Sequence, residues 1–208
     1  GYWGLAFVLA SNYNAALNPT SLDEINDAVT KAVLYSKNSS KREQGLINAL
    51  AKRYPKHEVD DMTPYAIAYA DAMKNVYKQF PGDIQVATLY AEALMNLHPW
   101  NLWLKDGTAQ PWTAEIQQLL ESILEKDPAH PGANHYYIHV MEASREAHKA
   151  LKSADTLRSL LPAAGHLVHM PSHIYIRTGN YHEGVLANMK ACAADSTYIT
   201  QSKEQGTY

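Results

Sequence analysis

The sequence predicts an all-α protein built from antiparallel helical hairpins, and three observations support this prediction. Apolar residues recur with the helical period along nearly the whole chain, while patterns typical of strands are almost absent. Proline and glycine separate the helical segments at short polar turns, such as FPGD at 80–83 and RTGN at 177–180. Two stretches near the C-terminus also repeat with a constant period.

The N-terminal half contains the first five predicted helices. The opening GYWGLAFVLA is apolar in a helical pattern, and NPTS follows it as a turn. Two further turns, YPKHEVDD at 54–61 and FPGD at 80–83, bound the next elements. The predicted helices of this half cover about 1–16, 21–36, 39–53, 61–79 and 83–97.

The C-terminal half contains five more, separated by KDPAHPG, LLPAAG and RTGN. They cover about 113–126, 132–144, 146–160, 165–178 and 181–194. The chain is therefore expected to form one array over 1–208 and to be a piece of a longer protein, since it lacks an initiator Met. The predicted hairpins are about 1–36, 39–80, 83–127 with an insertion at 98–112, 131–161 and 165–195.

The repeat period is 34 residues, measured from Pro128 to Pro162 (162 − 128 = 34). This register gives one repeat over 131–164 and the next over 165–198. Glycine and small residues occupy the turn and the second helix of the later repeat, at Gly179, Gly184 and Ala191. A period of 34 with small residues and a closing proline is typical of stacked helical hairpins.

On this period, and on the segments YWG, FPGD, LHPWNLW, HPGANHYYIH and GHLVHMPSHIYIRTG, the chain resembles the tetratricopeptide-repeat (TPR) proteins. More narrowly, it looks like a bacterial group of these proteins with the HYYIH and HxxHMPSHIYIRTG motifs. The resemblance implies a superhelix whose concave groove binds a peptide, a protein or a small molecule. It also implies a periplasmic or cell-envelope location, because members of that group often carry a secretion signal.

Composition excludes several other classes of protein. The formal net charge of −3 gives no electrostatic case for binding nucleic acid. No run of 18 apolar residues occurs, so no membrane span is predicted. The single cysteine, Cys192, excludes an intramolecular disulfide and is expected to be a small buried residue.

Histidines recur in the repeat register. His135 and His169 are 34 residues apart (169 − 135 = 34), as are His139 and His173 (173 − 139 = 34). By the TPR resemblance these are the fifth and ninth positions of their repeats, which line the groove. Because residues four apart share a helix face and packed helices lie about 8–10 Å apart, the imidazoles can converge. The groove set is His135, His139, Glu142, His166, His169 and His173, and Tyr136 and Arg177 are further candidate ligand contacts.

Imidazoles with one carboxylate and no thiolate suit Zn, Cu, Fe or Ni rather than Ca or Mg. The candidate metal ligands are His135, His139, His169, His173 and Glu142, the last either a direct ligand or a partner of a liganded imidazole. Two alternatives stay open: a polar peptide-binding groove and a structural histidine network. A metal with an open coordination position would instead indicate a metalloenzyme. Of the other five histidines, four are expected to be ordinary surface residues, namely His57, His130, His148 and His182, and His98 is assigned to neither class.

Two irregular segments flank this pattern. Pro171 interrupts a predicted helix, so that either the helix restarts there as its first residue or it kinks. The insertion HPWNLWLKDGTAQPW contains Trp100, Trp103 and Trp112 in place of a tight turn. These tryptophans either stack on a ligand at the edge of the groove or fill space between hairpins.

Overall fold

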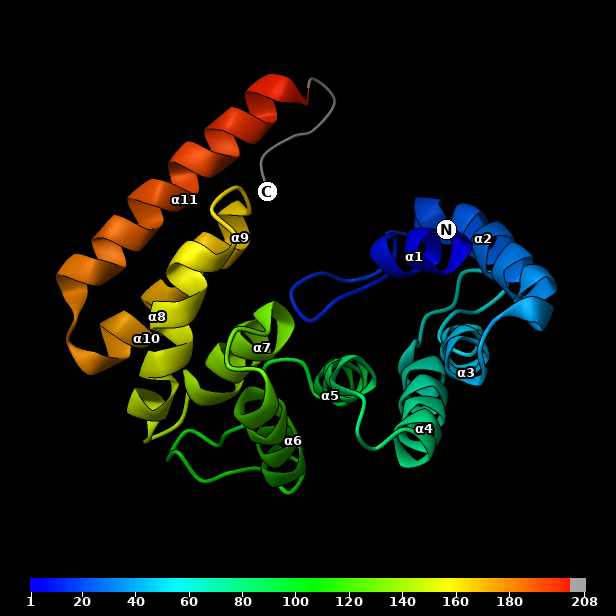
Figure 1. Cartoon of the computed structure of the whole chain (residues 1–208), viewed down its shortest axis with the longest axis horizontal. Helices are drawn as coiled ribbons and strands as arrows, with labels where there is room; N and C mark the ends of the chain where they lie inside the picture. The colour runs from blue at the N-terminus through cyan, green and yellow to red at the C-terminus, as the bar shows by residue number, and fades with distance from the viewer. Residues whose placement is uncertain (203–208) are drawn as a thin grey trace. The chain divides into compact units, whose positions relative to one another are not determined.

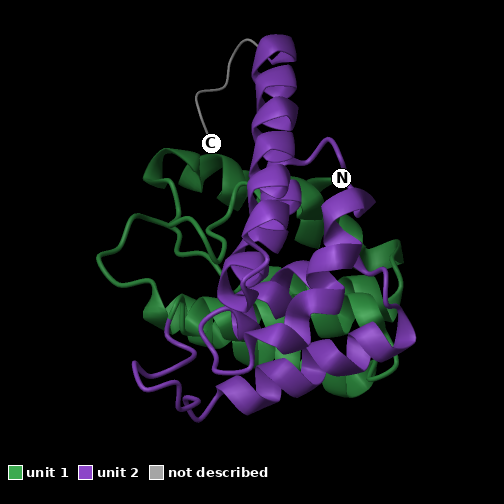
Figure 2. Cartoon of the chain, turned by 90° about the vertical axis from the view of Figure 1, so that its left-hand side faces the viewer, with its two compact units in different colours: residues 1–100 green, residues 101–208 purple. Residues whose placement is uncertain are grey.

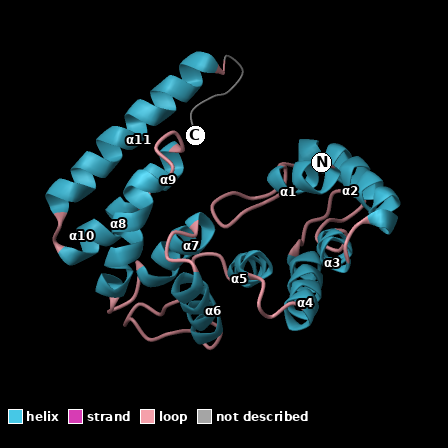
Figure 3. Cartoon of the chain, viewed as in Figure 1, coloured by secondary structure: helices cyan, strands magenta, loops and turns pink. Residues whose placement is uncertain are grey.

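A computed structural model describes residues 1–202, and these form an all-α protein of packed helices (Figure 1). Within that range there are no named strands, only isolated bridges between Asn12 and Ala15 and between Trp103 and Ala109 (Figure 3). The chain divides into two compact units, residues 1–100 and 101–208 (Figure 2). The predicted fold class is confirmed, whereas the single array over 1–208 stays a prediction.

The first unit contains five α-helices, and its two longest connections are the segments 9–21 and 51–62. Consecutive helices pack on one another from α1 to α5. Side chains cap several of them: Ser40 and Glu43 form a reciprocal capping box, and Asp83 accepts from the backbone N–H groups of Gln85 and Val86. The elements are α1 Tyr2–Val8, α2 Leu22–Tyr35, α3 Lys41–Leu50, α4 Thr63–Gln79 and α5 Ile84–Leu97, with one-turn 3-10 helices at Pro19–Ser21 and Ser36–Asn38.

The first predicted helix is too long. It ends at Val8 rather than near residue 16. The following segment turns back on itself, because the backbone groups of Asn12 and Ala15 pair and the Asn12 side chain accepts from the Asn14 N–H. An Asx turn of this kind offers the backbone an alternative to the helix.

A buried ion pair holds the interior of the first unit. Arg53 donates to Glu92 at 2.8 Å, with side-chain exposures of 5% and 3%. The guanidinium also donates to the Ser11 carbonyl and lies 4.6 Å from the centre of the Tyr69 ring. Burial raises the pKa of Glu92, and the Arg53 charge opposes that rise. Since two charges leave water together, their pairing is a condition for this core.

The second unit contains the two repeats predicted at 131–164 and 165–198. Each is a helical hairpin, and the second ends its first helix at Gly179, which adopts a left-handed conformation with φ of 82°. The elements of this unit are α6 Thr113–Lys126, α7 Pro131–Met141, a 3-10 helix Ala147–Ala150, α8 Leu151–Leu160, α9 Gly165–His169, α10 Pro171–Thr178 and α11 Tyr181–Gln201.

Branched and sulfur-containing side chains fill the core between these helices. Each side chain of this size contributes about 1.5–3 kcal/mol when fully buried. The largest fully buried ones are Ile116, Leu120, Ile123, Ile138, Met141, Leu157, Met170 and Ile174. They fix α7 against α8 and α10, so the faces of α7 and α10 that carry histidines have a defined spacing.

Pro171 restarts the helix, as one of the two alternatives predicted. It is the first residue of α10, where its missing N–H costs no intrahelical hydrogen bond. Met170 joins α9 to α10 with helical dihedrals, φ −50° and ψ −39°. Because the break adds no non-helical residue, His169 and His173 keep nearly the spacing of an unbroken helix.

The tryptophan-containing insertion is an ordered loop. In its 101–112 part, the indole N–H of Trp103 donates to the Val140 carbonyl of α7 at 2.6 Å. The indole N–H of Trp112 donates to the Asn101 carbonyl at 2.9 Å. Arg145 holds the tip of the loop through the Asp106 carbonyl. Both indoles therefore have partners that suit a role in fixing the loop.

Two expectations about single residues were wrong. His130 is 5% exposed, because it caps α7: its Nδ1 accepts from the Ala133 backbone N–H at 3.1 Å. Cys192 is exposed on α11 rather than buried. Over the described residues, no helix is both long and apolar enough to cross a bilayer.

Candidate metal centre

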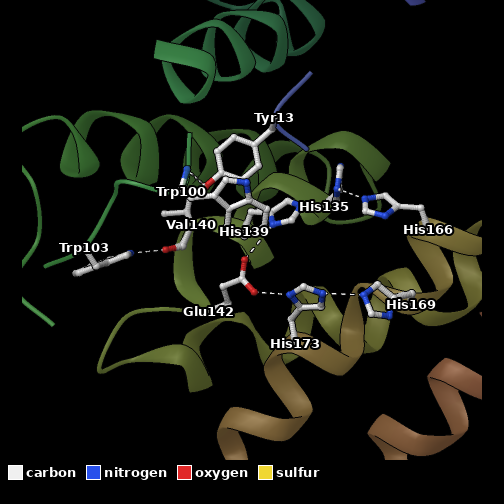
Figure 4. A network of polar contacts seen from close by, with 10 residues as sticks. All are labelled: Tyr13, Trp100, Trp103, His135, His139, Val140, Glu142, His166, His169 and His173. Atoms are coloured by element: carbon white, nitrogen blue, oxygen red, sulfur yellow. Dashed lines mark hydrogen bonds and ion pairs between the residues drawn. The ribbon is translucent and has the colours of Figure 1, made fainter. Parts of the chain in front are cut away.

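Three helices of the second unit bring five histidines and one carboxylate together (Figure 4). Helix α7 supplies His135 and His139, and Glu142 follows directly as its C-cap. Helix α9 supplies His166 and His169, and α10 supplies His173. Neighbouring rings lie 4.8 to 6.4 Å apart between centroids, so the imidazoles form one continuous cluster.

The first part of the cluster is a group of three histidines. One nitrogen from each of His135, His139 and His166 lies within 4.8 Å of the other two. The Nε2 atoms of His135 and His166 face each other at 3.0 Å. We call this set the three-histidine group. One cation coordinated by three imidazoles would draw these nitrogens to about 3.3 Å from one another.

Glu142 connects this group to the rest of the cluster. One carboxylate oxygen accepts from Nδ1 of His139 at 3.0 Å, and the other accepts from Nδ1 of His173. Each of these two imidazoles is thereby held with its proton on Nδ1 and its Nε2 available for a cation. Carboxylates that orient ligating histidines in this way are a regular feature of metal sites.

The second part of the cluster is the pair His169 and His173. Their Nε2 atoms are 2.8 Å apart. Nδ1 of His169 faces Oδ1 of Asn188, on α11, at 2.6 Å. Oxygen acceptors therefore hold the Nδ1 of both rings, while the two Nε2 atoms face each other.

The surroundings keep the three-histidine group uncharged at neutral pH. Burial lowers the pKa of His135 well below its usual value, and the neighbouring histidines lower it further. Burial likewise lowers the pKa of His139, against the opposing effect of Glu142, and that of His166 to about 4. Burial alone would raise the pKa of Glu142, but its bonds to His139 and His173 bring it to about 2. Neutral imidazoles beside an ionised carboxylate are in the protonation state that metal ligation requires.

A pocket of about 410 Å³ opens beside the pair. Its lining includes Glu142, His169, His173, Arg177, Tyr181 and Asn188. Apolar side chains of Ile176 and Val185 complete one wall, and both are exposed. A molecule in this pocket would therefore contact imidazole rings, the Arg177 guanidinium and apolar side chains at once.

Of the other residues predicted to contact a ligand, one lines this pocket, one lies beside the three-histidine group and the tryptophans lie elsewhere. Arg177 is in its lining, and Tyr136 lies beside the three-histidine group, with its ring 5.0 Å from that of His135. Of the described residues, the lining includes neither Trp103 nor Trp112. Trp100 belongs to the first unit, where its backbone N–H donates to the Tyr13 hydroxyl. It is 58% exposed.

The grouping of the histidines differs from the sequence prediction in one respect. The sequence predicted one metal shared by His135, His139, His169 and His173, whereas the compact set includes His166 in place of His169 and His173. His166 precedes the repeated pairs by three residues and lacks a counterpart in the earlier repeat, so the 34-residue register did not select it. His166 was predicted as a groove residue rather than a metal ligand, and Asn188 was missed, since its contact with His169 depends on how α11 packs.

Comparisons with known proteins support the fold. No family model matches the chain, and no curated protein matches its sequence. The chain is similar to the solved structure MamA MSR-1, with 14% identity, a TM-score of 0.56 and coverage of 95% of this chain and 94% of that one. MamA AMB-1 gives 12% identity, a TM-score of 0.57 and coverage of 94% and 96%. At these identities the likeness concerns the fold alone.

Proposed function

We propose that this protein is a TPR-type binding scaffold whose histidine cluster binds a transition-metal ion. The cation would be held by Nε2 of His135, His139 and His166, with Glu142 orienting His139 from outside. Zn, Cu, Fe or Ni suits this donor set of neutral imidazoles. The scaffold would present the metal beside a pocket for a peptide, a protein segment or a small molecule.

The observation that carries the proposal is the convergence of three imidazole nitrogens within 4.8 Å. Tetrahedral zinc with bonds of about 2.0–2.1 Å to nitrogen separates its ligand atoms by about 3.3 Å. The 3.0 Å between Nε2 of His135 and Nε2 of His166 is therefore only a few tenths of an ångström too short. Burial also lowers the pKa of each ring, so that all three are neutral at neutral pH and can ligate a cation.

A second candidate function is metal-dependent chemistry. The pocket of about 410 Å³ favours it, because Glu142, His169 and His173 line it and a substrate there would lie next to the cluster. Three protein ligands leave a coordination position open, whereas four would close the shell. Peptide binding without a metal is the remaining alternative, in which the imidazoles would form hydrogen bonds to the peptide.

Thermal unfolding of protein without a histidine tag tests the proposal. Zn²⁺ at 100 times its dissociation constant should stabilise the folded state by about 2.7 kcal/mol at neutral pH. His135→Gln and His139→Gln should each remove most of this stabilisation, and His148→Gln, an exposed residue outside the cluster, should preserve it. Equal melting temperatures with and without Zn²⁺, Cu²⁺, Ni²⁺ and Fe²⁺ would rule out the metal and leave peptide binding.

A further inference from the structure

The pair His169 and His173 lies outside the three-histidine group, and its geometry raises a separate question. Two imidazole nitrogens 2.8 Å apart need either a proton between them or a shared cation, because two lone pairs repel. The partners of the opposite nitrogens decide how many protons are available. Those partners are Glu142 for His173 and, for His169, Asn188 at 2.6 Å with the Ser172 hydroxyl further away at 3.5 Å.

Glu142 fixes the proton of His173. An ionised carboxylate can only accept, so Nδ1 of His173 must donate to it. The carbonyl oxygen of the Asn188 side chain accepts from Nδ1 of His169 in the same way. In their neutral forms both rings therefore present a bare Nε2 to the other.

We propose that His169 and His173 hold a second metal ion, so that the cluster is a two-metal centre. This inference rests on the proposed function and adds a site to it. Glu142 connects the two positions without ligating either, since one oxygen orients His139 and the other orients His173. A shift of about half an ångström in the Nε2 separation would suit tetrahedral zinc.

The second ion differs from the first in what surrounds it. Both of its histidines line the pocket of about 410 Å³, and two protein ligands leave two positions of a tetrahedral shell open. These positions would be taken by water or by an anionic group of a bound molecule. Arg177 in the same lining favours a ligand with a carboxylate or a similar anion. The second ion is therefore the exchangeable one and the one that contacts ligands.

Metal stoichiometry tests the two-metal centre. Tag-free protein is dialysed to equilibrium against buffered Zn²⁺, and bound zinc is measured by elemental analysis. The wild type should hold two ions per chain, His169→Gln and His135→Gln one each, and the double variant none. His182→Gln, exposed on α11, is the control and should hold two.

Asn188→Leu gives a second test that does not remove a ligand. Asn188 is exposed, so the fold should persist, and loss of its oxygen should weaken the second ion by about tenfold or more without changing the first. In Co²⁺-loaded protein, azide should change the visible spectrum of the wild type more than that of His169→Gln, which keeps only the ion at the three-histidine group. Two ions retained by His169→Gln would overturn the inference, as would one ion in the wild type that depends only on His135, His139 and His166. In the second case the proposed function stands, whereas no bound ion in any variant refutes both.

Discussion

Glu142→Gln is the substitution that most sharply separates a metal centre from a histidine network. Both carboxylate oxygens of Glu142 accept from imidazole nitrogens, one from His139 and one from His173. Glutamine keeps the shape but offers one acceptor and one donor. One of the two imidazoles can therefore keep its proton on Nδ1, and the other must turn or change its tautomer.

The magnitude follows from the lost interaction. A hydrogen bond to a charged group contributes about 1.5–3 kcal/mol. Loss of a partner that orients a ligating histidine typically weakens metal binding by about 10–100-fold, equal to about 1.4–2.7 kcal/mol. We expect Glu142→Gln to weaken Zn²⁺ binding by an amount within this range, because the variant also removes a negative charge near the cation.

Competition with a chromophoric chelator at neutral pH measures this affinity. Glu146→Gln is the matched control, since Glu146 is exposed and pairs with Lys149 at 2.7 Å on the surface. An affinity that is unchanged in Glu142→Gln, or reduced equally in Glu146→Gln, would refute the role assigned to the carboxylate.

Three further predictions concern stability. In metal-free protein, the pKa of His166 is about 4 in the folded state, against the ordinary value of 6.5 in the unfolded chain. Between these pH values the unfolded chain binds more protons than the folded one. The free energy of unfolding should therefore fall as the pH drops from about 6.5 to 4. The difference between the two pKa values limits this loss of stability to about 3 kcal/mol, and solvent screening of the half-buried ring reduces it to about 1–2 kcal/mol. Urea titrations with a chelator present should show a smaller loss in His166→Gln than in the wild type. Arg53→Ala should destabilise the first unit by about 3–5 kcal/mol, because it leaves Glu92 buried without its counter-ion. The double variant Arg53→Met, Glu92→Leu should recover most of that loss. A much smaller loss of stability in Arg53→Ala would contradict the buried pair. Trp103→Phe should lower stability by about 1 kcal/mol, measured by calorimetry, because it loses the hydrogen bond to the Val140 carbonyl. Metal affinity, measured by titration, should be unchanged. Weaker metal binding with unchanged stability would instead assign this indole a ligand-binding role.

Much of the fold was readable from periodicity. The 34-residue register predicted the two hairpins of the second unit, because helix faces that pack on neighbours must repeat with the hairpin. The proline at 171 restricted its helix to two alternatives, and packing selected the restart. The first helix was overestimated, because the Asn12 turn depends on a local side-chain contact that competes with helical hydrogen bonds.

The candidate site was only partly readable. The 34-residue register selected His135, His139, His169 and His173. Glu142 was selected because it shares a helix face with His135 and His139. Their division into a group of three and a pair was not predictable, because it depends on ring orientation and on partners such as Asn188. The buried Arg53–Glu92 pair was missed for the same reason, as its residues are 39 apart and meet only in the folded unit.

The most direct measurement of the central claim is an X-ray crystal structure of zinc-soaked protein, with anomalous data collected on both sides of the zinc absorption edge. We predict one anomalous peak within about 2.0–2.1 Å of Nε2 of His135, His139 and His166, and a second, weaker peak between Nε2 of His169 and His173. Ordered imidazoles with no peak at the three-histidine group, in protein saturated with Zn²⁺ at neutral pH, would contradict the claim.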